Sequence, residues 1–186
     1  MTAPCRIGWR NILTRKTRTG GDKPMQPLTP QHVQTVLDGF GLGLKVTYYD
    51  QSTATSQQAA DAIGCELGQI AKSLCFIVDG QPILIVASGD QRVDDRKLAD
   101  KFGVGRKKVK TAKPDECLAI YGFAPGGVAP VGHRTPDIPV YIEDSLLRYE
   151  QVWAAAGSAN ANFGLTVAQL RDITGGEVID CRKEPA

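Results

Sequence analysis

The sequence predicts an α+β fold with a mixed or antiparallel central β-sheet and short flanking helices. The clearest evidence is the segment 73–88, SLCFIVDGQPILIVAS, in which two apolar, β-branched runs flank Asp79-Gly80, a typical hairpin turn. Short amphipathic segments lie before and after this hairpin, as expected when helices cover a sheet. No GxGxxG motif follows a strand and no GxxxxGK[ST] motif is present, which argues against a doubly wound nucleotide-binding fold.

Capping residues and helical spacing predict five short helices. Thr29 is a suitable N-cap, Pro30 suits the first helical position, and apolar residues then recur at helical spacing until Gly41. Later helices show the same kinds of signal, such as the Asp94 start and the Thr166 cap. The expected helices cover 30–40, 55–63, 94–102, 113–121 and the segment from Thr166 to Gly175.

The strands are predicted from runs of β-branched and apolar residues. They are expected at 44–50, 73–78, 81–88, 139–144, 151–157 and 177–181. Both hairpin strands are nearly continuous in apolar residues, so we expect them to be covered on both faces. The chain has 186 residues, and we expect residues 25–186 to form one domain.

Charge is distributed unevenly along the chain. Residues 1–24 have a formal net charge of +5, so the remainder carries about −3 of the total of +2. This leader has no apolar signal-peptide core and is interpreted as a disordered tail or an upstream-start extension, with a transit peptide as the alternative. No apolar run is long enough to span a membrane. Five scattered cysteines without a CxxC pair argue against a disulfide framework and favour a cytoplasmic protein.

The usual catalytic and metal-binding patterns are missing from the sequence. There is no GxSxG elbow, and the two histidines, His32 and His133, form no HxxxH or HExxH motif. We therefore expect no metal, no cofactor and no Ser or Cys triad.

Four segments are candidates for a binding or catalytic role. Lys72 precedes an apolar strand, where an ammonium either reaches the surface or faces a cleft that holds a phosphate or a polarised ester. The segment 122–133, GFAPGGVAPVGH, is either a surface loop or a stiff loop whose glycines let backbone N–H groups approach a ligand. Residues 157–162, GSANAN, are either an ordinary turn or polar groups that line a pocket. The basic run 101–113 is either a solvated face or a contact for a phosphate backbone.

Taken in order, these motifs resemble the YbaK/ProX family. The segments are IAKSLCF, ILIVASGDQRVDDRKLADKFG, GFAPGGVAPVGH, PVYIEDSLL and VWAAAGSANANF, and the resemblance extends from about residue 28 to residue 180. The family consists of bacterial aminoacyl-tRNA editing domains that stand alone or are inserted in prolyl-tRNA synthetase. The resemblance implies a mixed, partly barrel-like sheet with flanking helices. It also implies an enzyme of translation fidelity that hydrolyses the ester of tRNA mischarged with a small amino acid.

The resemblance also assigns roles to individual residues. Lys72 matches the functional lysine of the family, and the GxxxP loop matches residues 126–130. The expected substrate-binding residues are Gly126, Gly127, Pro130, Gly132, Gly157, Ser158, Asn160 and Asn162. Independently of the resemblance, the charge of the basic run places the tRNA backbone at Arg106, Lys107, Lys108 and Lys110. Asn162 replaces an aspartate of the cysteine-specific branch and Ala155 replaces a serine, so both departures weaken the expectation of cysteinyl-tRNA specificity.

The expected mechanism needs no protein nucleophile. Water or a ribose hydroxyl of the substrate would attack the ester, while Lys72 and the backbone of 126–132 position it and stabilise the oxyanion. His133 is expected at the rim. The partners would be the acceptor end of aminoacyl-tRNA and, in addition, an aminoacyl-tRNA synthetase. A non-catalytic module that binds tRNA ends or a synthetase, and a hydrolase of small esters, are the alternatives.

Overall fold

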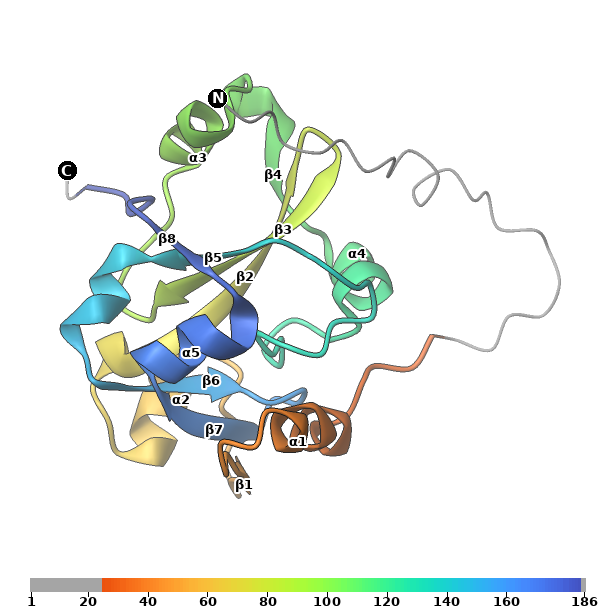
Figure 1. The fold of residues 1–186 in the computed structure, drawn as a ribbon, viewed down its shortest axis with the longest axis vertical. Helices are drawn as coiled ribbons and strands as arrows, with labels where there is room; N and C mark the ends of the chain where they lie inside the picture. Colours follow the sequence, from red (N-terminus) through yellow and green to blue (C-terminus); the bar gives the residue numbers. More distant parts are fainter. Residues whose placement is uncertain (1–24, 185–186) are drawn as a thin grey trace, which may run out of the picture.

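The computed structural model describes residues 25–184 (Figure 1). The basic leader expected at residues 1–24 lies outside the described residues. Within them, eight strands form one mixed sheet in the order β1-β7-β6-β2-β3-β5-β8, with β4 on β2. The strands are β1 Val46–Tyr48, β2 Ile70–Val78, β3 Gln81–Ser88, β4 Val109–Thr111, β5 Val140–Glu143, β6 Gln151–Ala155, β7 Ala161–Thr166 and β8 Glu177–Ile179.

The hairpin of β2 and β3 is the centre of the sheet. Its turn residues, Asp79 and Gly80, have φ of 49° and 80°, which is the positive-φ pair that a tight hairpin requires. β2 pairs in parallel with β6 through its first residues and antiparallel with β4 through its last. One edge of β2 is therefore shared by β6 at its start and by β4 at its end, in keeping with the partly barrel-like sheet that was expected.

Both faces of β3 are buried, as its continuous apolar sequence predicts. Leu84 and Val86 belong to one apolar cluster, which also contains residues of α1 (Pro30–Gly39) and α5 (Val167–Thr174). Ile83 and Ile85 point to the other face, against α3 (Asp95–Phe102). The mixed sheet with helices on both faces confirms the predicted fold class.

The helices begin and end close to the predicted positions. The hydroxyl of Thr29 caps α1, which ends at Gly39, one residue before the expected end at 40, and Gly41 follows with a φ of 68°. Thr55 forms a capping box with Gln58 at the start of α2 (Ser56–Ile63). Short 3₁₀ turns complete the fold at η2 (Leu67–Gln69), η3 (Arg106–Lys108) and η5 (Asp144–Arg148).

Several predictions of secondary structure need correction. β2 begins at Ile70, so Lys72, which was expected before the strand, lies within it. The helix expected at 113–121 is a single α-turn, α4 (Pro114–Glu116), followed by a wider π-helical turn, η4 (Cys117–Tyr121). The sequence did not predict β4, and it placed Asn162 in a loop although β7 contains it. Both strands contain residues with low strand propensity, and pairing of β4 with β2 and of β7 with β1, which are distant in sequence, fixes them.

Two further expectations concern membranes and cysteines. No helix in residues 25–184 is long and apolar enough to cross a membrane. Cys75 is 4% exposed and belongs to the larger apolar core cluster.

Candidate active site

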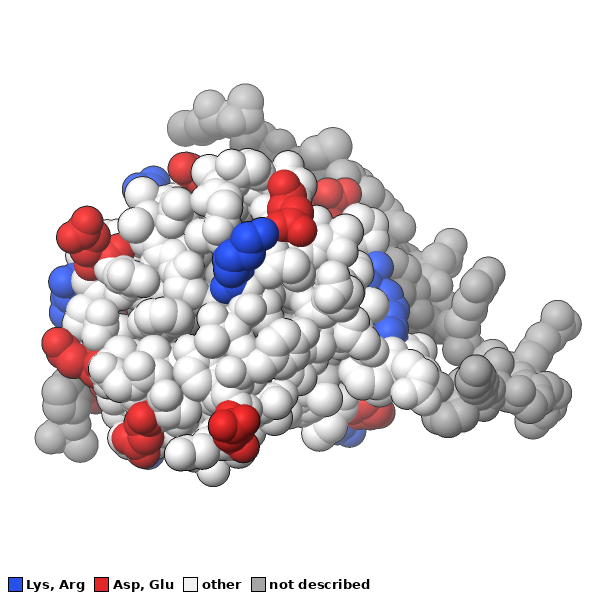
Figure 2. Space-filling view, turned by 90° about the horizontal axis from the view of Figure 1, so that it is seen from below, with Lys and Arg blue, Asp and Glu red and all other residues white. Residues whose placement is uncertain are grey.

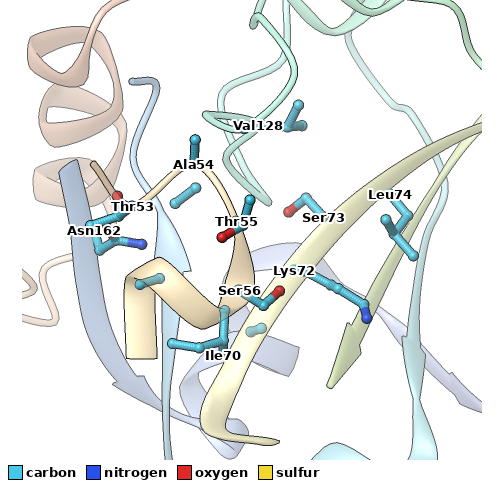
Figure 3. A pocket seen from close by; sticks show the side chains of 14 residues that line it. Thr53, Ala54, Thr55, Ser56, Ile70, Lys72, Ser73, Leu74, Val128 and Asn162 are labelled. Carbon is cyan, nitrogen blue, oxygen red and sulfur yellow. The ribbon is translucent and has the colours of Figure 1, made fainter. Parts of the chain in front are cut away.

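A pocket of about 240 Å³ lies between the start of β2, the N-terminal end of α2, and the loop that begins at Gly126 (Figure 3). The end of β6 and the start of β7 close its remaining side through Ala155 and Asn162. Lys72, Gly126 and Asn162 all line this pocket, so the structure brings one residue from each of three predicted segments together.

The segment 53–56 forms a fourth wall that sequence reasoning missed. Thr53, Ala54, Thr55 and Ser56 line the pocket directly before and at the start of α2. The sequence showed only a helix cap at Thr55. Because α2 begins at this wall, its partially positive N-terminal end lies beside the pocket.

Unpaired polar atoms in the pocket wall indicate a ligand. Thr53 is 4% exposed and Asn162 is 2% exposed, yet Thr53 Oγ1 and Asn162 Oδ1 have no hydrogen-bond partner. Ser73 Oγ, in the same pocket wall, is likewise buried without a partner. A buried polar atom without a partner costs about 1–3 kcal/mol, and three of them around one cavity are explained when a ligand supplies the missing bonds.

Backbone donors also remain unused at the pocket. In the described part of the chain, no hydrogen bond is formed by the backbone N–H of Gly126 or of Val128. Both residues line the pocket. Backbone N–H groups on residues that line a cavity can stabilise an oxyanion where they point into it.

Several predicted binding residues pack the loops together instead of lining the pocket. Gly127 contacts the backbone of Ser158 so closely that an added Cβ would lie 2.9 Å from its N and Cα atoms. The N–H of Gly157 donates to Gly127 O at 2.9 Å, which joins the two loops. Asn160 is exposed and its amide donates to Tyr49 O at 3.4 Å. These residues therefore hold the loops around the pocket in place without lining it.

The second half of the glycine-rich loop is held by the two histidines. His32 Nε2 lies 2.8 Å from Gly132 O, which fixes the loop to α1, and Pro130 is buried. His133 Nε2 lies 3.0 Å from Ala129 O, and burial lowers the pKa of this imidazole more than that contact raises it. Neither histidine lines the pocket, so the structure gives His133 a packing role.

The Lys72 ammonium is half-buried at the edge of the pocket. Its Nζ donates to Gly89 O at 3.2 Å and to Gln91 O. Figure 3 shows its side chain pointing away from Asn162. Burial lowers the pKa of Lys72, and the carboxylates of Asp90 and Glu143 partly offset this effect. The ammonium is therefore neither fully solvated nor aimed at the centre of the pocket, and it has one further N–H donor for a ligand.

The predicted tRNA-backbone residues lie at the other end of the sheet. Arg106, Lys107, Lys108 and Lys110 are exposed on η3 and β4, and β4 pairs with residues 76–78 of β2, which lie roughly 13–20 Å along the strand from Lys72. Two of them are in ion pairs, Arg106 with Asp95 and Lys108 with Asp79. Figure 2 shows the face near β1 and α2, where charged side chains are few and scattered.

No group of His, Cys, Asp and Glu among the described residues could hold a metal ion. Within residues 25–184, the lining of the pocket consists of hydroxyl, amide and apolar side chains, with Lys72 as its single charged residue. The chemistry available in this pocket is hydrogen bonding and charge stabilisation.

The model of the aminoacyl-tRNA editing domain family matches residues 50–173, a span that contains the whole pocket. The chain belongs to this family. This editing domain is 41% identical over 141 residues to the uncharacterized protein YwhH of Bacillus subtilis (strain 168), covering 75% of this chain and 87% of that protein.

Two further similar proteins have descriptions that mention prolyl-tRNA synthesis. The proline–tRNA ligase of Staphylococcus aureus (strain Newman) is 31% identical over 90 residues, which are 48% of this chain and 15% of the ligase. A crystal structure of a protein described as a candidate trans-editing enzyme for prolyl tRNA synthetase has a TM-score of 0.77 and 39% identity. The match covers 88% of this chain and 99% of that one.

Proposed function

We propose that this protein is a trans-acting deacylase, which hydrolyses the ester between a small amino acid and the terminal adenosine of a mischarged tRNA. The observation that carries the proposal is the set of three buried, unpaired oxygens beside Lys72 and two unused backbone N–H groups. Membership in the aminoacyl-tRNA editing domain family supports the class of substrate.

The size of the pocket favours a small aminoacyl group. At about 240 Å³ it lies below the range of roughly 300–1,000 Å³ that is typical of sites for drug-sized ligands. Thr53 Oγ1, Ser73 Oγ and Asn162 Oδ1 can accept hydrogen bonds from a substrate ammonium. Asn162 offers a neutral acceptor, so the ammonium would be held without a carboxylate.

The mechanism uses no nucleophile from the protein. Among the described residues that line the pocket there is no His, Cys, Asp, Glu or Tyr, so no side chain is suited to act as a general base. Water would attack the ester carbonyl, and the ribose oxygen would leave with a proton taken from that water. A neighbouring ribose hydroxyl of the terminal adenosine would orient the attacking water. The N–H groups of Gly126 and Val128 would stabilise the oxyanion, and Lys72 would hold a phosphate or the developing charge.

The test is a panel of tRNAs charged with alanine, serine, threonine or cysteine, with the prolyl ester as the control. The tRNA for proline is the first choice because relatives of this chain are parts of proline–tRNA ligases. We expect at least one mischarged tRNA to be deacylated faster than in buffer. Binding without turnover on every tRNA would instead support a non-catalytic module that binds tRNA ends or a synthetase. Equal hydrolysis of small amino-acid esters with weak salt dependence would support a small-ester hydrolase.

A further inference from the structure

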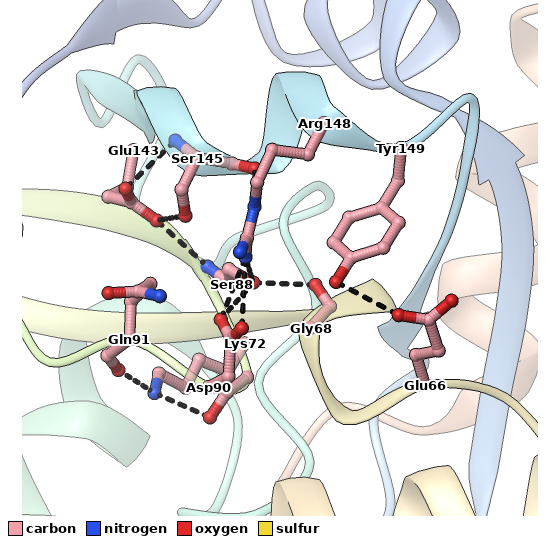
Figure 4. Close-up of polar contacts among 11 residues, drawn as sticks. Glu66, Gly68, Lys72, Ser88, Asp90, Gln91, Glu143, Ser145, Arg148 and Tyr149 are labelled. Carbon is pink, nitrogen blue, oxygen red and sulfur yellow. Dashed lines mark hydrogen bonds and ion pairs between the residues drawn. The ribbon is translucent and has the colours of Figure 1, made fainter.

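The turn that follows β3 holds the Lys72 ammonium. Residues 88–91 form a tight turn, closed by a 3.0 Å hydrogen bond from Gln91 N–H to Ser88 O. The carbonyls of Gly89 and Gln91 in this turn both accept from Lys72 Nζ. The position of this turn therefore decides where the ammonium lies (Figure 4).

Close packing and hydrogen bonds fix the start of the turn. A Cβ added at Gly89 would lie 2.2 Å from Leu67 O, so only glycine allows the turn to approach the 3₁₀ turn η2. The hydroxyl of Ser88 lies 2.6 Å from Gly68 O and 2.7 Å from Asp90 Oδ1. Its single proton can serve one of these acceptors at a time.

An ion pair fixes the middle of the turn. Arg148 Nη2 lies 2.9 Å from Asp90 Oδ1 and 3.0 Å from Asp90 Oδ2, and it also donates to Ser88 Oγ at 3.1 Å. Arg148 Nε donates to Ser145 O at 2.8 Å, so the guanidinium joins the turn to η5. A planar guanidinium in several hydrogen bonds at once gives more directional positioning than an ammonium would.

Neighbouring charged groups also affect the protonation of the Lys72 ammonium. The charged groups that face the Lys72 ammonium are Asp90 in the turn, Glu143 at the end of β5, and Arg92 after the turn. Glu143 is 0% exposed and accepts hydrogen bonds from Ser88 and Ser145. Burial favours loss of the Lys72 proton, as does Arg92, whereas the two carboxylates favour its retention.

We propose that Asp90 and Arg148 are positioning residues for Lys72, because their ion pair holds the 88–91 turn whose carbonyls fix the ammonium beside the pocket. The inference rests on the proposed function in one respect, the role of Lys72 in deacylation. Neither Asp90 nor Arg148 lines the pocket, so they act on the reaction through Lys72.

The test compares Asp90→Asn and Arg148→Met with the control Asp180→Asn. Asp180 is also held through both carboxylate oxygens by one cation, Lys97, but it does not contact the turn. The side chains of Asp90 and Arg148 are 31% and 45% exposed, so both variants are expected to fold. Arg148→Lys keeps the charge without the planar fork and should recover part of the lost activity.

Two readouts separate positioning from a general effect on folding. The first is the pH titration of the Lys72 side chain, followed by NMR of ¹³Cε-labelled lysine and assigned with Lys72→Arg. Asp90→Asn should titrate Lys72 at lower pH than the parent, and Asp180→Asn should leave it unchanged. The second is steady-state deacylation, for which we expect kcat to fall roughly 10–100-fold with little change in KM.

The outcomes distinguish this proposal from the proposed function. Parent-like kcat in both Asp90→Asn and Arg148→Met would overturn the positioning role, whether or not the titration moves. An unchanged Lys72 titration in Asp90→Asn would also overturn it. If the parent hydrolyses no aminoacyl-tRNA, the proposed function fails, whereas the NMR titration still decides whether the turn sets the state of Lys72.

Discussion

The contact between the two pocket loops predicts a large effect for Gly127→Ala. The Cβ of alanine would lie 2.9 Å from N and Cα of Ser158 and 3.0 Å from its carbonyl carbon. These are backbone atoms, so the loops must separate. Gly127 itself has no positive φ, and the effect is therefore steric.

The magnitude follows from two contributions. Overpacking of this kind costs about 1–3 kcal/mol, and weakening the 2.9 Å hydrogen bond from Gly157 N–H to Gly127 O adds about 0.5–1.5 kcal/mol. We expect the free energy of unfolding to fall by about 2–4 kcal/mol. For a chain of this length the melting temperature should fall by roughly 2–4 °C for each kcal/mol.

Denaturant unfolding and the deacylation assay measure the two effects of Gly127→Ala. We expect lower stability together with slower deacylation, because Gly126 and Val128 on either side line the pocket. Gly39→Ala is the matched control. An added Cβ there meets nothing within 4 Å, and the substitution should be neutral or slightly stabilising. If Gly127→Ala unfolds at the same denaturant concentration as the parent, the account of the loop contact is wrong.

Three further predictions concern the pocket, a buried imidazole and the basic run. Thr53→Val removes a buried hydroxyl without a hydrogen-bond partner, so the free energy of unfolding measured with denaturant should rise by about 1 kcal/mol while deacylation slows. A lower free energy of unfolding would contradict the unpaired state of Thr53 Oγ1. Burial lowers the pKa of His133, so the unfolded chain binds the proton more readily, and the free energy of unfolding should fall as pH drops below about 6.5. In thermal melts, His133→Gln should weaken this dependence of stability on pH, and an unchanged dependence would refute the buried, neutral state of His133. Replacing Lys107 and Lys110 by alanine should reduce the slope of log affinity for tRNA against log salt by up to about 0.7–0.9 for each lost phosphate contact, and an unchanged slope would place the tRNA elsewhere.

Local signals explain why much of the fold could be predicted. The caps at Thr29 and Thr55 and the Asp79-Gly80 turn act within a few residues, and the structure places helices and the hairpin where they indicate. The continuous apolar run of β3 likewise predicted burial on both faces.

Contacts that form only in the folded sheet explain what the sequence did not reveal. β7 contains Gly164, where an added Cβ would lie 2.9 Å from the Trp153 ring, so a residue that disfavours strands is required by packing against β6. The segment 53–56 gave no local sign of a binding role, because its contact with the start of β2 exists only in the folded chain.

The candidate site was predicted in outline and changed in detail. The three segments with Lys72, Gly126 and Asn162 meet at one pocket. The glycines at 127 and 157 were expected to approach a ligand, whereas the structure shows them in contact with each other's loops. Sequence alone does not distinguish these reasons for a glycine, since both require a backbone without a side chain.

Single-turnover deacylation by the parent and by Lys72→Ala tests the central claim most directly. The assay uses saturating protein and the mischarged tRNA that the panel identifies as the best substrate, with Lys72→Arg as the variant that keeps the charge. Removal of one group that stabilises developing charge typically costs about 10²–10³ in rate, and we expect a loss in this range for Lys72→Ala with partial activity in Lys72→Arg. Equal rates for the parent and Lys72→Ala would contradict the assignment of this pocket as the site of hydrolysis.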